Sequence, residues 1–155
     1  MLGRDYAGQE CSIARTLEIV GERWTLLVLR DALAGTRRFD DFRAKLGIAR
    51  NVLQTRLTRL VGEGVLERRL YHERPPRHEY LLTPAGRDLL PVLIALMRWG
   101  DVHRAPGGPP TLIVHAGCGG DATPAMTCER CGAELRARDL EIKDGPGATR
   151  ELAPA

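Results

Sequence analysis

Residues 39–82 read FDDFRAKLGIARNVLQTRLTRLVGEGVLERRLYHERPPRHEYLL, and this stretch carries the clearest structural signal in the chain. Phe39, Phe42 and Leu46 fall on one side of a short helix, because residues three and four apart share a helical face. Leu46-Gly47-Ile48 follows, and a glycine there favours a sharp turn between two helices. The remainder predicts a second helix and then a two-stranded hairpin.

The second helix is expected over residues 49–63 and has two dissimilar faces. Its apolar face points to a core and consists of Leu53, Leu57, Leu60 and Val61. Its outer face is polar and consists of Arg50, Asn51, Gln54, Thr55 and Thr58. An Asn or Gln side chain can form two hydrogen bonds with the edge of one adenine, and an Arg side chain can do the same with guanine. Thr offers a hydroxyl or a methyl group. The pattern indicates a helix that reads bases, although an ordinary solvated helix has a similar composition.

A basic β-hairpin is expected directly after that helix, with its tip at Arg74-Pro75-Pro76-Arg77. Gly64 is a typical helix end, and the two prolines would keep the tip from pairing with another strand. Residues 48–78 hold seven arginines against three glutamates, a net charge of +4 that exceeds the +3 of the whole chain. A polar-faced helix followed by a basic hairpin predicts a winged helix-turn-helix whose ligand is duplex DNA.

Two sets of side chains are predicted to contact that DNA. The base-reading set consists of Arg50, Asn51, Gln54, Thr55 and Thr58. The set that holds phosphates or enters the minor groove consists of Arg38, Arg56, Arg59, Arg68, Arg69, Arg74 and Arg77.

Helices are also expected on both sides of this motif. SIARTLEIVG after Cys11 has a helical apolar stripe, and residues 24–33 are apolar nearly all round, as in a buried central helix. Thr83 and Pro84 favour a helix start, and Pro91 predicts a kink inside the helix that follows. That last helix has a wide apolar surface, which predicts a two-fold dimer through terminal helices; the alternative is that it completes the monomer core.

Composition bounds the class of protein. The chain has 155 residues, 43% of them hydrophobic, with no apolar run long enough for a membrane span and no signal-peptide pattern, so a cytoplasmic protein is expected. Residues 1–104 carry a net charge of +5 and residues 105–155 a net charge of −2, which assigns the polyanionic partner to the first part. No phosphate-binding glycine loop, nucleophile elbow or carboxylate dyad occurs, so no enzyme is predicted.

The expected fold class is mainly α with a small β wing (α+β), followed by a small β-rich C-terminal module that includes a strand at residues 111–114. The domain layout expected from the sequence is a flexible N-terminus at 1–10, a winged helix-turn-helix with dimerisation helices at 11–104, a linker at 105–110, a Cys/His β module at 111–144, and a flexible tail at 145–155.

The chain resembles the HxlR-type family of bacterial winged-helix transcriptional regulators. The resemblance runs from Cys11 to Trp99 and rests on Gly21-Glu22-Arg23-Trp24-Thr25-Leu26-Leu27, Arg38-Phe39, Leu53, Arg56-Leu57, Leu60, Gly64-Val65-Leu66, Pro75-Pro76, Tyr80, Leu82-Thr83 and Gly86. It implies a homodimer through N- and C-terminal helices, with a recognition helix in the major groove and the wing beside it. The family often has Ser where this chain has Ala49, and the segment after Ala105 lies outside the family pattern.

Some members of the family sense oxidants or electrophiles through the cysteine that matches Cys11, so the resemblance makes Cys11 a candidate sensing residue. The N-terminus of a helix favours a thiolate, whereas the neighbouring Glu10 opposes it. A redox-sensing thiol and an idle thiol both remain open.

A second Cys/His pattern lies in the C-terminal module, at His115, Cys118, Cys128 and Cys131. An HxxC pair followed after nine residues by CxxC can place one nitrogen and three thiolates around tetrahedral Zn²⁺. A redox-active CxxC pair and thiols without metal are the competing interpretations. DNA binding itself requires no cofactor, and the alternative function is a metal- or thiol-centred sensor or interaction protein.

Overall fold

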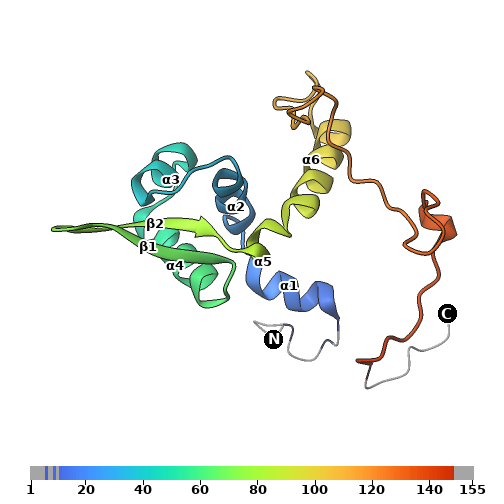
Figure 1. Ribbon diagram of the computed structural model, residues 1–155, viewed down its shortest axis with the longest axis horizontal. Coiled ribbons are helices and arrows are strands. Elements are labelled where there is room, and N and C mark those ends of the chain that lie inside the picture. The colour runs from blue at the N-terminus through green and yellow to red at the C-terminus, as the bar shows by residue number, and fades with distance from the viewer. Residues whose placement is uncertain (1–5, 7–8, 10, 149–155) are drawn as a thin grey trace. The chain divides into compact units, whose positions relative to one another are not determined.

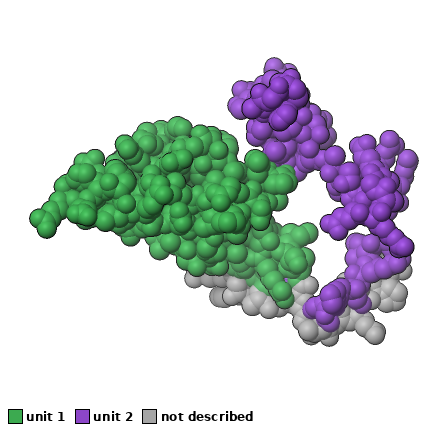
Figure 2. Space-filling model, in the orientation of Figure 1, with its two compact units in different colours: residues 1–6, 11–93 green, residues 7–10, 94–155 purple. Residues whose placement is uncertain are grey.

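The computed structural model describes residue 6, residue 9 and residues 11–148 (Figure 1). The flexible ends expected at 1–10 and 145–155 therefore fall largely outside the described residues. The chain divides into two compact units, one of residues 1–6 and 11–93 and one of residues 7–10 and 94–155 (Figure 2). The domain limits drawn from the sequence stay predictions.

The structure confirms a mainly helical fold with a two-stranded wing. The first unit holds four helices, a hairpin and a short helix in that order (Figure 1). The elements are α1 (Ser12–Val20), α2 (Thr25–Leu33), α3 (Phe39–Leu46), α4 (Arg50–Gly62), β1 (Leu66–Glu73), β2 (Pro76–Leu82), α5 (Pro84–Arg87), α6 (Leu90–Arg104) and the 3₁₀ turn η1 (Ala137–Asp139). The sequence placed Phe39 in the first helix of the motif, and it predicted the second helix, α4, to within one residue at each end.

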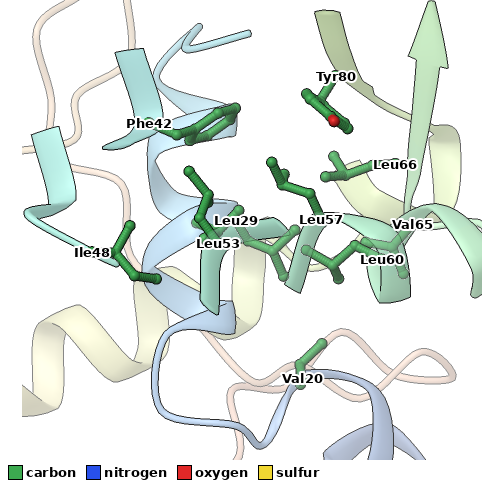
Figure 3. Close-up of a cluster of buried hydrophobic side chains, with 11 residues drawn as sticks. Val20, Leu29, Phe42, Ile48, Leu53, Leu57, Leu60, Val65, Leu66 and Tyr80 are labelled. Atoms are coloured by element: carbon green, nitrogen blue, oxygen red, sulfur yellow. The ribbon is translucent and has the colours of Figure 1, made fainter. Parts of the chain in front are cut away.

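The core forms where α2, α3 and α4 meet the base of the hairpin (Figure 3). Leu53, Leu57 and Leu60 of α4 are 0% exposed, as their helical spacing predicted. They pack with Phe42 of α3 and Leu29 of α2, which are equally buried. Burying a side chain of this size contributes about 1.5–3 kcal/mol, so this cluster accounts for much of the stability of the unit.

The turn between α3 and α4 has the geometry that its glycine predicts. Gly47 adopts a left-handed φ of 61°, and its N–H donates to the carbonyl of Arg43 at 3.0 Å. Ile48 next to it is 3% exposed and fixes the elbow in the core. Ala49 then caps α4 without a side-chain hydrogen bond, so α4 is anchored by its apolar face and not by its cap.

The wing is an antiparallel pair joined by a turn at Arg74 and Pro75. Its register shifts between Leu70 and His72, which leaves Tyr71 at a bulge. The N–H of Tyr80 donates to the carbonyl of Arg37 at 2.7 Å, and an isolated bridge joins Arg38 to Glu79. The connection between α2 and α3 is thereby held along β2.

The kink predicted at Pro91 is wrong. The helix that starts after Thr83 ends at Arg87, and a new helix, α6, begins at Leu90. Pro91 thus lies in the first turn of α6, where the missing N–H costs nothing because first-turn amides have no helical partner. The predicted cap at Thr83 is confirmed, since its Oγ1 accepts a hydrogen bond from Gly86 N at 3.1 Å.

The C-terminal segment contains little regular structure. The strand predicted at 111–114 is not formed: its only β contact is an isolated bridge from Val114 to Asp121, and a second bridge joins Thr127 to Glu134. No residue from 105 to 148 is buried. Among the described residues, no helix is long and apolar enough to cross a membrane.

Candidate nucleic-acid interface

The outer face of α4 presents the whole predicted base-reading set to solvent. Arg50, Asn51, Gln54, Thr55 and Thr58 are all exposed. Gln54 Nε2 donates to Thr58 Oγ1 at 3.1 Å, and Thr55 Oγ1 donates to the backbone oxygen of Asn51 at 2.9 Å. These exposed local bonds exchange readily for bonds to another polar partner, so the face is chemically ready for base edges.

A groove of about 510 Å³ separates the start of α4 from the wing. Arg50 and Gln54 line it from α4, Arg77 lines it from the wing, and Arg38 lines it from the residue before α3. Members of the two predicted sets therefore share one concavity. Asp40 and Asp41 of α3 also line the groove, and their negative charges would keep phosphate away from that part of it.

Two arginines of this groove are stacked on aromatic rings. The Arg38 guanidinium lies 4.9 Å from the centroid of the Tyr71 ring, and that of Arg50 lies 5.1 Å from the Phe39 ring. Such stacking orients the guanidinium plane while its N–H edge stays available for hydrogen bonds. Tyr71 was absent from the sequence prediction, because the bulge that aims it at Arg38 leaves no signal in the hairpin pattern.

The four wing arginines differ in how much they are already engaged. Arg69 forms an ion pair with Glu79 at 2.6 Å, and Arg68 Nη2 lies 2.9 Å from His78 Nδ1. Arg74 and Arg77, which we call the tip arginines, make no ion pair in the part of the chain that the structure describes. Among the described residues, their guanidinium groups are therefore the least engaged of the four.

Arg56 and Arg59 of α4 both contact carboxylates, in α1, between α1 and α2, and at the end of α4. Arg56 Nη2 lies 3.2 Å from Glu22 Oε2, and the Arg56 side chain is only 19% exposed. Arg59 lies within 4.0 Å of both Glu18 and Glu63. These carboxylates compete with DNA phosphate for the same donors, and a phosphate contact by either arginine stays a prediction.

Cys11 is the residue immediately before α1 and is half-buried. Its backbone is extended, and it forms no side-chain cap bond. Its sensing role stays a prediction.

The four predicted metal ligands lie in two pairs. His115 Nδ1 is 3.2 Å from Cys118 Sγ. In the second pair, hydrogen bonds from the backbone of Cys131, the backbone of Arg130 and the Cys131 side chain lower the pKa of the Cys128 thiol. Within the described residues, no three His, Cys, Asp or Glu side chains are gathered closely enough to hold a metal ion. The pairs are formed, but the set of four is not brought together.

A helix-turn-helix, an exposed polar second helix and a basic β-hairpin together define the winged-helix class of transcription factors. Residues 19–107 match the model of the HxlR-like helix-turn-helix family, and the protein belongs to this family. It is a transcriptional regulator with a helix-turn-helix domain, and this class of protein is not enzymatic.

Named relatives agree with this assignment. An HTH-type transcriptional regulator of Mycobacterium tuberculosis is 48% identical over 143 residues, which is 92% of this chain and 90% of that protein. YdeP of Bacillus subtilis, also named an HTH-type transcriptional regulator, is 35% identical over 107 residues, covering 66% of this chain and 84% of YdeP.

Solved structures extend the similarity to the fold. The crystal structure of the transcription factor PA1607 matches with a TM-score of 0.79 at 34% identity, over 88% of this chain and 96% of that one. The redox regulator HypR in its reduced form matches with a TM-score of 0.57 at 32% identity, over 61% of this chain and 94% of HypR.

Proposed function

We propose that this regulator binds a specific duplex DNA sequence as a homodimer, with α4 in the major groove and the wing on the backbone or in the minor groove. One observation carries the proposal: the exposed polar face of α4 and the tip arginine Arg77 line the same groove. Bases and backbone of one duplex would then be contacted together.

The dimensions of α4 support its place in the major groove. Its 13 residues are long enough for about 20 Å of helix, and a B-DNA major groove of about 12 Å admits one α-helix. Gln54 and Asn51 would pair with adenine edges, and Arg50 would pair with guanine. Thr55 and Thr58 would contact the thymine methyl or a nearby phosphate.

The wing would supply affinity more than specificity. The tip arginines carry uncompensated charge at the end of the hairpin, and each phosphate that they neutralise releases a counterion. Arg68 would contribute from the base of the wing, and Arg38 from the residue before α3. Arg56, Arg59 and Arg69 would do so only on leaving their carboxylates, so we place them last in the backbone set.

Exposed apolar residues on the terminal helices support the homodimer. Val92, Leu96 and Trp99 of α6 recur at spacings of four and three, which places them on one face, and each is exposed. Ile13 and Leu17 of α1 are exposed at the same spacing. A two-fold dimer that buries these stripes would remove them from water and present two copies of α4 to two half-sites.

The primary test is fluorescence anisotropy of the purified protein with its own upstream DNA and with a scrambled duplex, over a series of salt concentrations. We expect tighter binding to the upstream DNA and a steep loss of affinity with salt. Equal binding to both duplexes would contradict the expectation that the protein recognises its own promoter. Absence of binding to either, even at low salt, would favour the cysteine-centred alternative.

Two variants separate base reading from phosphate contact. Gln54→Ala should cost about 1–3 kcal/mol of discrimination at one or two base pairs of the site. Arg77→Gln should weaken binding to all sequences alike and reduce the salt slope by about one unit. Arg136→Gln is the matched control, because it removes an exposed arginine from the C-terminal segment and should change neither property.

The oligomeric state has its own test. Leu96→Glu should convert a dimer into a monomer in sedimentation velocity, because it places a charge in the proposed apolar interface. Leu70→Glu is a matched control, since Leu70 on the wing and Leu96 are both 49% exposed. A wild-type monomer at all concentrations would refute the homodimer.

Sensing of an oxidant through Cys11 is a further element of the proposal, and an oxidant or a small molecule would then be the effector. Its support is the position of Cys11 before α1 and the similarity to HypR, which is a redox regulator. Oxidant should change the DNA affinity of the wild type, and Cys11→Ser should abolish this response. A response that persists in Cys11→Ser would assign the effect to another thiol.

A further inference from the structure

Residues 115–120 and 128–133, which we call the two ligand loops, have the same hydrogen-bonding pattern. In each loop the first residue donates its N–H to the carbonyl five positions later: His115 to Gly120 at 2.8 Å, and Cys128 to Ala133 at 2.9 Å. In each loop the fifth residue also donates back to the first. These bonds are Gly119 N to His115 O and Gly132 N to Cys128 O, both at 2.8 Å.

The same agreement continues on both sides of the loops. An isolated bridge closes each loop, from Val114 to Asp121 and from Thr127 to Glu134. One bond further out, the N–H of Ala122 donates to Ile113 and that of Leu135 to Met126, each at 2.8 Å. Equivalent residues of the two loops lie thirteen positions apart in the sequence, so the chain forms the same structural unit twice in succession.

The turn of each loop requires a glycine. Gly119 and Gly132 both have φ of 72°, a left-handed conformation that side chains other than glycine rarely adopt. Each glycine directly follows the fourth residue of its loop, which is Cys118 in one and Cys131 in the other. The tight turn therefore brings the first and fourth residues of the loop together. His115 Nδ1 and Cys118 Sγ already lie 3.2 Å apart for this reason.

The repeat argues for a metal and against a thiol redox pair. A CxxC pair alone could serve as a dithiol, but the first loop has His115 where the second has Cys128, and a histidine forms no disulfide. The property shared by the two loops is a pair of side chains that ligate soft divalent metals. A common loop geometry around both pairs is therefore explained by coordination and not by disulfide exchange.

Burial supports the same inference. No residue from 105 to 148 is buried, and even Leu112 and Ile142 are 59% and 86% exposed. A segment of this size has too little apolar core to hold its loops in one arrangement, and small modules of this kind are commonly stabilised by a structural metal.

We propose that the two ligand loops close on a single Zn²⁺ per chain, bound by His115 through a ring nitrogen and by the thiolates of Cys118, Cys128 and Cys131. The nine residues between Cys118 and Cys128 supply the connection. Because the described residues hold no preformed group of three ligands, closure of the loops accompanies binding. Three thiols lose their protons to solvent as three Zn–S bonds form, and the histidine binds in its neutral form.

Such a site is structural. Four protein ligands fill a tetrahedral coordination shell, which leaves no position for a catalytic water. The inference is independent of the proposed DNA-binding function, because none of its residues belongs to the groove beside α4. Zinc would order the C-terminal segment whether or not α4 reads bases.

The experiment is elemental analysis of the full-length protein, purified under reducing conditions without chelator, followed by exchange with Co²⁺. We expect about one zinc per chain, and on exchange the visible d–d bands of tetrahedral cobalt with a near-ultraviolet thiolate charge-transfer band. Zinc content below a tenth per chain, together with a featureless cobalt spectrum, would overturn the proposal. A Cys128–Cys131 disulfide in place of metal would do the same.

Three variants test which residues bind the metal. Cys131→Ser and His115→Ala should weaken zinc binding at least about tenfold in competition with a chromogenic chelator. His115→Cys should retain the metal and intensify the charge-transfer band, because it adds a fourth thiolate. Cys11→Ser is the control and should bind zinc as the wild type does; equal loss in this variant would refute the assignment. The cobalt spectrum of the wild type decides the question even if a variant misfolds.

Discussion

The winged-helix unit and the C-terminal segment are stabilised in different ways. In the first, Leu29, Phe42, Leu53 and Leu57 are completely buried, and the helices are held by apolar contacts that are distant in sequence. In the segment 105–148 no residue is buried, and the two ligand loops and η1 are held by local hydrogen bonds. Burial specifies an arrangement of elements, whereas local hydrogen bonds specify only each loop. The second region therefore needs a further constraint, for which we have proposed zinc.

The largest expected effect comes from opening the core. Leu57→Ala should lower the free energy of unfolding by about 2–5 kcal/mol, because it removes a fully buried side chain and leaves a cavity. Ile142→Ala in the C-terminal segment should change it by less than about 0.5 kcal/mol, since that side chain is exposed. Urea unfolding followed by circular dichroism measures both. Similar losses would show that the two regions do not differ in the way described.

A smaller effect is expected at the helix cap after the wing. Thr83→Ala should lower the free energy of unfolding by about 0.5–2 kcal/mol, because the N–H of Gly86 loses its acceptor and the hydroxyl no longer donates to Gly64 O. Thr123→Ala is the matched substitution in the C-terminal segment, and we expect no measurable change from it. Thermal unfolding of the two variants measures the difference. Equal midpoints would show that the cap contributes nothing to stability.

The ion pairs of the two regions provide a third comparison. Arg56→Gln should destabilise the protein by about 0.5–1 kcal/mol, because the half-buried Arg56 loses its bond to Glu22 and part of its packing. Arg138→Gln removes a pair with Asp139 that is long, at 3.9 Å, and largely solvated, so its effect should be negligible. Chemical denaturation quantifies both. If Arg56→Gln leaves stability unchanged but reduces DNA affinity, the main role of Arg56 is phosphate binding and not stabilisation.

The smallest expected effect is that of metal removal on the winged-helix core. Chelation should change the free energy of unfolding of that core by less than about 0.5 kcal/mol, because stabilising contacts in separate regions act independently. Hydrogen exchange of the same sample should become faster in residues 111–144 and stay constant in α2 and α4. A large loss of core stability on chelation would show that the two regions are coupled.

Sequence patterns predicted the parts of the fold in which a local rule operates. The spacing of Leu53, Leu57 and Leu60 indicated the buried face of α4, and Gly47 and Thr83 marked a turn and a cap that the structure confirms. The kink at Pro91 and the strand at 111–114 were wrong, each for its own reason. A proline is tolerated in the first helical turn, and an apolar run forms a strand only when it has a partner strand to pair with.

The sequence predicted which kinds of side chain form the candidate site, but not the contacts that each of them makes. Every member of the base-reading set is exposed, as an amphipathic pattern requires. The arginines of the second set differ among themselves in ways that the pattern does not contain. Arg38 is stacked on Tyr71, Arg69 is paired with Glu79, and the tip arginines have neither an acidic partner nor a stacked ring in the described residues.

The sequence by itself determined the helix-turn-helix with its wing and the family to which the chain belongs, because apolar periodicity, glycine turns and charge clusters act over a few neighbouring residues. The tertiary structure decided which charges are available and which loops are alike. Glu22 reaches Arg56 from 34 positions away, and the bonds that make the two ligand loops equivalent depend on backbone geometry. Contacts between residues distant in the chain exist only once the chain has folded, so no local pattern can contain them.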